Sequence, residues 1–352
     1  MTEASPKLNR TTWRPLPGVA LPYQPRSLWL LAISLIAITA LVIATLLTGE
    51  FTLSPSGVWQ TLTGQQDDSL ANLVVLELRL PRILACLLVG LALGLSGAIF
   101  QGMARNPLAS PDVVGFTTGA ATGVLVLLLV EGFAVTASLS VGAMVGGFGT
   151  ALIVYLLAMR RGVHGQRLIL VGIAIGAMLA AINSYLITRA ELESAQAARI
   201  WMHGSLNGVS WPQVLPLLLW SLILVPAAMA LSRRLGLLEF GDDIAAGLGL
   251  PVNRSKTQLI VVSITLAAAA ISVGGPIGFV ALAAPQLARK LAGTGGIALL
   301  PSAAVGATLL LAADLLAQRL LAPFQIPVGL LTGALGGAYL LFLLSREWRR
   351  VD

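Results

Sequence analysis

Long apolar stretches separated by short polar segments run through almost the whole chain. Ten of them predict membrane helices, because a helix needs about 20 mostly apolar residues to cross a bilayer. The eighth is too short for a straight crossing, so we expect a half-helix enclosed by protein. The fold class predicted is all-α integral membrane, with one transmembrane domain at 28–345 between polar tails at 1–27 and 346–352. The ten stretches are 28–48, 83–103, 113–130, 134–158, 168–188, 213–232, 257–274, 277–288, 297–317 and 327–345.

Composition and the placement of charge support this topology. Hydrophobic residues make up 57% of the chain and charged residues 11%, whereas soluble proteins carry about 25% charged residues. With both termini in the cytoplasm, 17 of the 22 Lys and Arg residues fall in cytoplasmic segments, as the positive-inside rule requires. The net charge of +7 therefore reflects topology and indicates no nucleic-acid partner. The tail at 1–27 has no cleavage signal, so the first helix is expected to be retained.

Glycines recur at four-residue spacing in the apolar stretches, which lets helix backbones approach closely. Two stretches also look like corresponding broken elements, at residues 106–112 and 274–279, and the topology places them on opposite sides of the membrane. Such a pair indicates inverted-repeat halves, although ordinary helix ends would look the same. The glycine sets are Gly90/Gly94, Gly115/Gly119/Gly123, Gly142/Gly146, Gly172/Gly176 and Gly329/Gly333/Gly337.

Arg79 and Arg82 are exceptions to the positive-inside pattern. They stand on the periplasmic side, at the mouth of the second apolar stretch. All other charged residues of the loop that leads to them are acidic. One interpretation is interfacial anchoring of long cationic side chains. The other is docking of an acidic partner from outside.

The cytoplasmic loop 233–256 predicts a short helix that faces water. Asp242 or Asp243 is suited to cap its start, and Gly247 or Gly249 to end it. An apolar row along it indicates either a helix lying on the membrane surface or a knob that fits a groove on a partner. This row comprises Leu238, Phe240, Ile244 and Leu248.

Groups that would indicate chemistry within the chain are missing from the sequence. Ser255-Lys256-Thr257 lacks the glycine loop of an ATP site, and the two histidines, His164 and His203, are predicted on opposite faces, which argues against a metal site. Only Asp314 lies well within an apolar stretch, fewer ionisable groups than an ion-coupled carrier usually has. We therefore expect no catalytic residue, no metal and no cofactor on this chain, with energy supplied by another subunit.

Taken together, these residues resemble the FecCD family of ABC transporter permeases, which import ferric siderophores, haem and cobalamin. Within the family the match is to the FepG type of subunit, from ferric enterobactin importers. The resemblance rests on RLPR at 79–82, SGAIFQGMARNPLASPDVVGF at 96–116, GSLNGVSW at 204–211, LLEFGDDIAAGLGLPV at 237–252, GPIGFVALAAPQLAR at 275–289, AAD at 312–314 and PVG at 327–329.

The resemblance implies a type II ABC importer in the bacterial inner membrane. Its parts would be two permease subunits (here with a FepD-type partner), two ATPases that bind ATP in the cytoplasm, and a periplasmic binding protein that delivers a ferric siderophore. Docking of that protein is implied for Arg79 and Arg82. A third family arginine falls at Gln318 here and is followed by Arg319, which leaves the third docking contact open.

Further site residues follow from the same resemblance or from polarity in the fifth apolar stretch. A short periplasmic helix is implied near residues 199–206. Polar residues of the fifth stretch either line the pathway or pack inside the bundle. The coupling residues expected are Glu239, Asp242, Asp243, Ile244 and Leu248, the cytoplasmic gate is expected at His164, Gly165 and Gln166, and the lining candidates are Asn183, Ser184, Tyr185 and Thr188.

Three other interpretations stay open at this point. A channel or secondary carrier without an ATPase would leave the loop 233–256 with no role. A membrane enzyme is disfavoured by the missing catalytic groups. Within the family, cobalamin, haem or a hydroxamate siderophore could replace a catecholate as cargo, and the sequence does not decide between a homodimer and a heterodimer.

Overall fold

The computed structural model describes residues 11–351 apart from 17–18, 24, 50, 66–67, 112–114, 132–135, 159–164, 294–295 and 323. Ten helices match the ten predicted stretches one for one. Among the described residues, seven helices are long and apolar enough to cross a membrane. The ten are α1 (Pro25–Leu47), α4 (Leu80–Ala104), α5 (Phe116–Glu131), α6 (Thr136–Ala158), α7 (Gly165–Arg189), α9 (Trp211–Leu238), α11 (Val252–Gly274), α12 (Val280–Ala292), α13 (Leu299–Arg319) and α14 (Val328–Val351).

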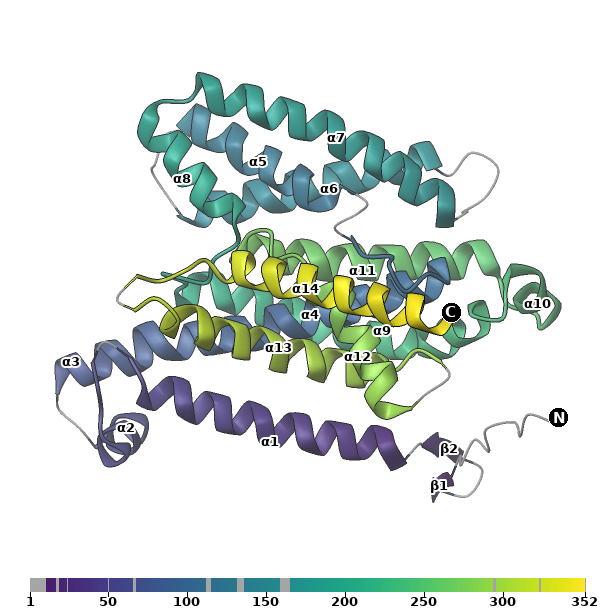
Figure 1. Ribbon diagram of the computed structural model, residues 1–352, viewed down its shortest axis with the longest axis horizontal. Coiled ribbons are helices and arrows are strands. Elements are labelled where there is room, and N and C mark those ends of the chain that lie inside the picture. The colour runs from purple at the N-terminus through teal and green to yellow at the C-terminus, as the bar shows by residue number, and fades with distance from the viewer. Residues whose placement is uncertain are drawn as a thin grey trace.

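Helix α4 is the centre of the bundle. It is buried along most of its length and packs against α9, α11, α12 and α13. Helices α5, α6, α7 and α8 (Leu192–Met202) form a group of their own on one side of this core, while α1 lies on the opposite side (Figure 1). The short α12 packs between α4, α13 and α1, which confirms the expectation of a half-helix enclosed by protein.

The two ends of the bundle carry different elements. One end holds α2 (Pro55–Leu62), α3 (Ser69–Asn72) and α8, and the other holds α10 (Asp242–Gly247), the strands and the end of α14 (Figure 1). Helix α3, the π-helical turn η1 (Leu73–Arg79) and α4 run on as one continuous helix. We call the first end the arginine end, because Arg79 and Arg82 lie there, and the second the α10 end.

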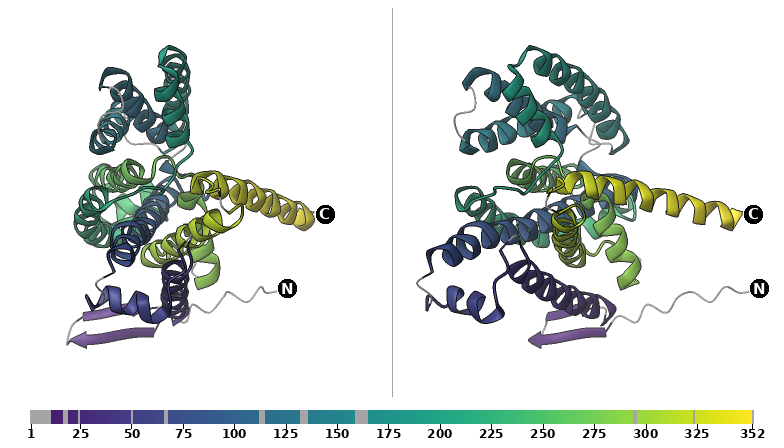
Figure 2. Two further views of the ribbon diagram at one scale, coloured as in Figure 1. Left: turned by 90° about the vertical axis from the view of Figure 1, so that its left-hand side faces the viewer. Right: turned by 60° about the vertical axis from the view of Figure 1, so that its left-hand side comes forward.

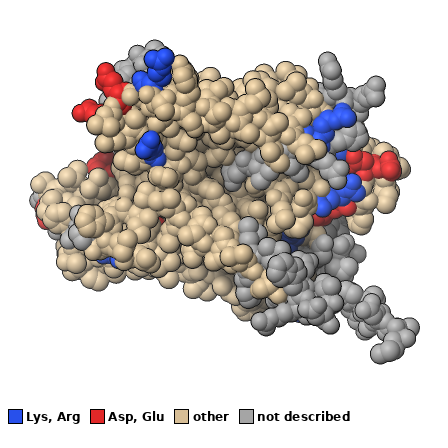
Figure 3. All heavy atoms as spheres, turned by 45° about the horizontal axis from the view of Figure 1, so that its top comes forward, with Lys and Arg blue, Asp and Glu red and all other residues tan. Residues whose placement is uncertain are grey.

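Charged side chains gather at these two ends. Between them, the face shown in Figure 3 is a broad belt without Lys, Arg, Asp or Glu. This distribution is the one expected for a bundle that spans a bilayer, since a charged group is costly in the hydrocarbon core.

The predicted glycine packing occurs between two helix pairs. A Cβ atom added to Gly90 of α4 would lie 2.4 Å from the carbonyl oxygen of Gly306 in α13, and one on Gly123 of α5 would lie 2.0 Å from that of Gly142 in α6. The backbones therefore touch with no room for a side chain. Gly333 and Gly337 of α14 have nothing within 4 Å of such an atom, so these two make no such contact within the chain.

Three elements differ from the prediction. The N-terminal tail forms a hairpin of β1 (Thr11–Leu16) and β2 (Val19–Tyr23), paired antiparallel. The periplasmic helix expected near 199–206 is α8, which begins at Leu192 and ends at Met202. Helix α14 continues to Val351 through the predicted tail, and it projects away from the bundle in both views of Figure 2.

Candidate functional site

Arg79 fastens the arginine end of the bundle. Its guanidinium donates hydrogen bonds to the carbonyl of Leu46, in the last turn of α1, and to that of Phe51, 2.5 Å away. The last carbonyls of a helix have no partner within the helix, so Arg79 supplies one from the neighbouring η1. The side chain is buried, so within this chain Arg79 joins η1 to the end of α1 and to the loop that follows it.

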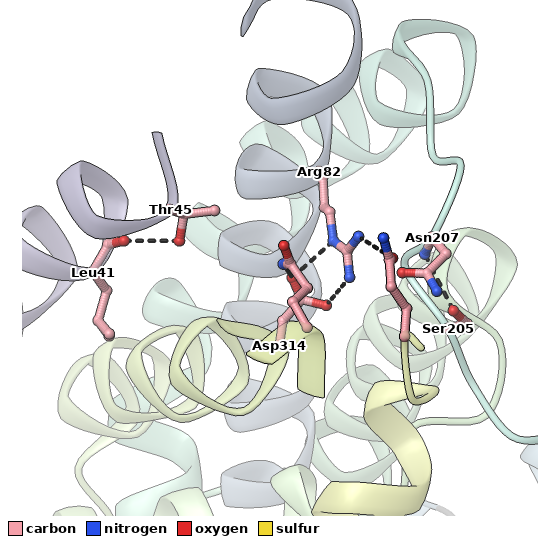
Figure 4. Close-up of polar contacts among 8 residues, drawn as sticks. Leu41, Thr45, Arg82, Ser205, Asn207 and Asp314 are labelled. Atoms are coloured by element: carbon pink, nitrogen blue, oxygen red, sulfur yellow. Dashed lines mark hydrogen bonds and ion pairs between the residues drawn. The ribbon is translucent and has the colours of Figure 1, made fainter. Parts of the chain in front are cut away.

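Arg82, three residues further on, makes an ion pair within the membrane helices. Its Nε donates to Oδ2 of Asp314 and its Nη2 to Oδ1, both at 2.9 Å, and its Nη1 donates to Oε1 of Gln325 at 3.1 Å. Figure 4 shows Arg82 of α4 and Asp314 of α13 facing each other across the helix contact. Two parallel bonds to one carboxylate are the strongest geometry for such a pair.

The two partners differ in burial. The Asp314 side chain is 2% exposed and that of Arg82 is 14% exposed, while Gln325 lies at the surface. Gln318 adds a second donor to the carboxylate, with its Nε2 2.7 Å from Oδ2 of Asp314. Removing one member of a buried pair typically costs about 3–5 kcal/mol, so this cluster is fixed in the fold. Arg319 is exposed at the end of α13.

The ion pair lies on the same antiparallel contact as the glycines. Passing from Arg82 to Gly90 to Gly94 in α4 takes eight and then four residues. The partners in α13, from Asp314 to Gly306 to Ser302, follow the same steps in reverse. Every member of each row is therefore on one helix face, and close backbone packing sets the position of Arg82.

At the α10 end three large apolar side chains are exposed. Phe240, Ile244 and Leu248 are 67%, 56% and 63% exposed and follow one another at four-residue spacing. Leu238, which the sequence placed in this row, is buried in the core. It belongs to the last turn of α9, where it faces the bundle rather than the solvent.

The start of α10 differs from the prediction and its end agrees with it. Gly241, with φ 108°, is the N-cap residue, and neither aspartate caps the helix. Asp242 pairs instead with the buried Lys256 at 2.5 Å, because a buried ammonium group requires a counter-charge. The helix ends at Gly247, and Gly249, whose φ is 82°, follows its C-cap residue Leu248.

Glu239, the C-cap residue of α9, is bonded to the segment just before α13. Its two carboxylate oxygens accept from the backbone N–H of Ile297, at 3.1 and 3.3 Å. Burial raises the pKa of the Glu239 carboxyl, and the Ile297 N–H and the charge of Arg289 offset part of that rise. The carboxylate is thus held at the junction of two helices, where its charged form is disfavoured by the loss of water.

The lining candidates on α7 separate into two groups. Asn183 is buried, and its Nδ2 donates to the Thr118 carbonyl of α5 at 3.2 Å. Ser184, Tyr185 and Thr188 are exposed on the other side of the helix. The structure therefore gives Asn183 a packing role within this chain and leaves the other three facing outward.

The predicted gate is described only in part. His164 lies outside the described residues, and α7 begins at Gly165. Among the described residues no group of three or more His, Cys, Asp or Glu side chains is placed to hold a metal ion.

Comparison with known proteins identifies the family. The profile of the FecCD transport family matches residues 35–346. The chain belongs to the FecCD transport family. Among its relatives, the ferric enterobactin transport system permease protein FepG of Escherichia coli K12 is 48% identical over 324 residues, covering 91% of this chain and 98% of FepG. The achromobactin transport system permease protein CbrC of Dickeya dadantii is 37% identical, covering 90% of this chain and 91% of CbrC.

A solved structure shares the fold of this FecCD chain. It is an inward-facing conformation of a metal-chelate type ABC transporter, with a TM-score of 0.78 and 31% identity, covering 90% of this chain and 99% of the other. A multi-pass permease fold follows for this chain. Both relatives are permease proteins of transport systems by name, and the chain is accordingly assigned as a permease.

Sequence reasoning missed the partners that position the site residues of this FecCD chain. It noted Asp314 as a lone buried acid, but its partner Arg82 is 232 residues away in the sequence. It also missed Gln101 of α4, which accepts from Arg289 and donates to the Leu282 carbonyl, both at 2.9 Å, and so ties α4 to α12. The signal available was polarity in an apolar stretch, which indicates a partner without naming it.

Proposed function

We propose that this chain is the transmembrane permease subunit of an ATP-driven importer that moves a ferric siderophore, ferric enterobactin or a similar catecholate, from periplasm to cytoplasm. The observation that carries the proposal is 48% identity to the ferric enterobactin permease FepG over almost the full length of both chains. The cargo is a bulky anion and passes through without covalent change.

Uptake measured one siderophore at a time tests the substrate. A strain that lacks its own permease pair would express this chain with its sister subunit, ATPase and binding protein. Iron-labelled enterobactin should accumulate, while hydroxamate siderophores, haem and cobalamin should not. Accumulation of one of those three in place of enterobactin would overturn the substrate assignment and leave the permease assignment intact.

Energy is proposed to enter at α10 from a cytoplasmic ATPase. Three large apolar side chains, Phe240, Ile244 and Leu248, are exposed in and directly beside this helix of six residues, and an exposed apolar surface of this kind suits a groove on a partner. Asp242, bound to Lys256, and Glu239, bound to Ile297, would pass the movement of this helix to α11 and α13.

A second permease subunit is proposed to cover α14. Gly333 and Gly337 leave open space on that helix, and glycine faces of membrane helices are typical sites of close helix association. A related but different sister subunit, of the FepD type, is the partner we propose. The exposed Ser184, Tyr185 and Thr188 of α7 would then line the path between the two subunits, with the gate near 164–166.

The arginine end is proposed to face the periplasm and to dock the binding protein. Because Arg79 is buried and bonded to two carbonyls, docking would use Arg82 and the exposed Arg319. Cysteine labelling tests the orientation in a Cys86→Ser background. Gln65→Cys should react with an impermeant thiol reagent added from the periplasm and Asp243→Cys should not, and the reverse pattern would overturn the orientation.

A further inference from the structure

Arg82 has more hydrogen-bond donors than its partners in this chain use. A guanidinium group carries five N–H donors. Asp314 takes one on Nε and one on Nη2, and Gln325 takes one on Nη1. One N–H on Nη1 and one on Nη2 are left over. The Asp314 side of the group is buried, whereas Gln325 and the tip of Arg82 reach the surface.

We propose that Asp314 is a positioning residue for docking at this end: it holds Arg82 by the Nε edge and presents the remaining Nη donors to a carboxylate of the binding protein. The inference rests on the proposed function, since it requires an acidic partner at the arginine end. It assigns to Asp314, which never touches that partner, a part in setting the strength of the contact.

The alternative is that Asp314 competes with the partner for Arg82 and releases it on docking. The surroundings of Asp314 argue against release. With Arg82 gone, a carboxylate that is 2% exposed would keep only neutral partners, the amide of Gln318 and the thiol of Cys86, and an uncompensated buried charge is strongly destabilising. Gln318 stands where the family resemblance implies an arginine, so Arg82 is the one cation that this structure pairs with Asp314 among the described residues.

Close packing of α4 against α13 also argues that Arg82 stays bound to Asp314. Arg82 and Asp314 extend the contact row in which Gly90 meets Gly306 and Gly94 meets Ser302 at backbone distance. Neither helix can turn without losing that contact. The guanidinium is thus fixed before the partner arrives, and a fixed group loses less conformational entropy on binding than a free arginine side chain.

The test compares two variants that remove one negative charge from the same end. Asp314→Asn removes the carboxylate that holds Arg82, and Glu77→Gln removes an exposed carboxylate of η1. Affinity for the purified binding protein would be measured on the assembled importer in nanodiscs. Glu77→Gln should bind as tightly as wild type or slightly tighter, because the surface becomes more positive. Asp314→Asn should bind about threefold to tenfold more weakly, the cost of ordering a freed side chain.

Equal or tighter binding by Asp314→Asn would overturn the proposal, since simple charge neutralisation predicts that result. A double-mutant cycle separates positioning from general damage to the fold. In an Arg82→Ala background, Asp314→Asn should have no further effect on affinity, whereas an additive effect would also overturn it.

Two further results keep the test decisive. If Asp314→Asn does not fold, Arg82→Lys takes its place, because lysine keeps the charge and cannot serve two partners with one planar fork. Docking of Arg82→Lys at wild-type strength would contradict the proposal, and docking as weak as Arg82→Ala would support it. If Arg82→Ala itself docks normally, the proposed docking role of this end fails and the role of Asp314 fails with it.

Discussion

The arginine end and the α10 end are both proposed to bind proteins, yet they are built in opposite ways. At the arginine end Arg79 and Arg82 are bonded within the chain, and Arg82 lies on a long helix whose backbone touches its neighbour. At the α10 end three exposed apolar side chains lie in and directly beside a helix of six residues, next to the Asp242–Lys256 pair.

The difference follows from what each surface is proposed to do. A binding protein docks and leaves in each cycle, so fixed charges that guide association suit it, because charge complementarity mainly sets the rate and specificity of encounter. An ATPase that stays bound and transmits movement needs buried apolar contact, which provides most of the lasting affinity in interfaces. The same chain thus offers a fixed arginine at one end and a group of exposed apolar side chains at the other.

The largest effect is expected from Leu248→Asp at the α10 end. A carboxylate in the middle of an apolar contact is buried without a partner, at a cost of several kcal/mol. The assembled importer should lose its ATPase, or keep it with hydrolysis no longer linked to uptake. Ala246→Asp is the matched control, since it adds the same charge to α10 outside the row of Phe240, Ile244 and Leu248. Normal uptake by Leu248→Asp would show that this helix only covers the membrane surface.

Arg79→Ala should distinguish the structural arginine from the docking arginine. The change removes two hydrogen bonds from a charged donor, each worth about 1.5–3 kcal/mol, so thermal unfolding in detergent should occur at a clearly lower temperature. Variants that still fold should bind the binding protein at wild-type strength. Arg82→Ala should weaken docking, and it should also lose stability because the buried Asp314 is left without its partner. If both variants behaved alike, the division of roles would be wrong.

Gly90→Ala tests the rigid contact beneath the arginine end. The new methyl group would meet the Gly306 carbonyl and the Ala307 Cα, at 2.4 and 2.8 Å. Overpacking of this kind costs about 1–3 kcal/mol, so a lower unfolding temperature is expected. Gly149→Ala in α6 is the control, because nothing lies within 4 Å of its Cβ position. Equal stability of the two variants would show that α4 and α13 are less tightly joined than described.

The smallest effect concerns pH at the α10 end. Burial raises the pKa of Glu239, so the folded chain holds this proton to a higher pH than the unfolded chain does. The contribution of Glu239 to stability is therefore complete below the ordinary glutamate pKa and is lost as pH rises through the raised value. Glutamine does not ionise, so Glu239→Gln does not lose stability in this way. The unfolding temperature of the variant minus that of wild type should therefore increase from pH 4.5 to pH 8. A constant difference across that range would contradict the assignment.

The sequence predicted the ten apolar helices and their order because each depends on a local apolar stretch, but it did not predict α2, α3 or η1. It did not predict which glycines face which helix, since Gly306 has no four-residue glycine partner and its contact with Gly90 depends on the fold. Arg79 and Arg82 are identical in type and almost adjacent, but one meets α1 and the other α13. Only the three-dimensional arrangement shows that Arg79 is a buried hydrogen-bond donor and that Arg82 lies nearer the surface. The inverted repeat of the two halves stays a prediction.

Directional transport in a sealed system tests the central claim most directly. The complete importer would be placed in proteoliposomes, with ATP enclosed on the side of the α10 end and the binding protein with iron-labelled enterobactin on the side of the arginine end. We predict that labelled iron accumulates on the ATP side. No accumulation should occur when ATP is placed on the side of the arginine end and the loaded binding protein on the side of the α10 end. Accumulation without ATP, or equal accumulation in both arrangements, would contradict the assignment of this chain as the permease of an ATP-driven siderophore importer.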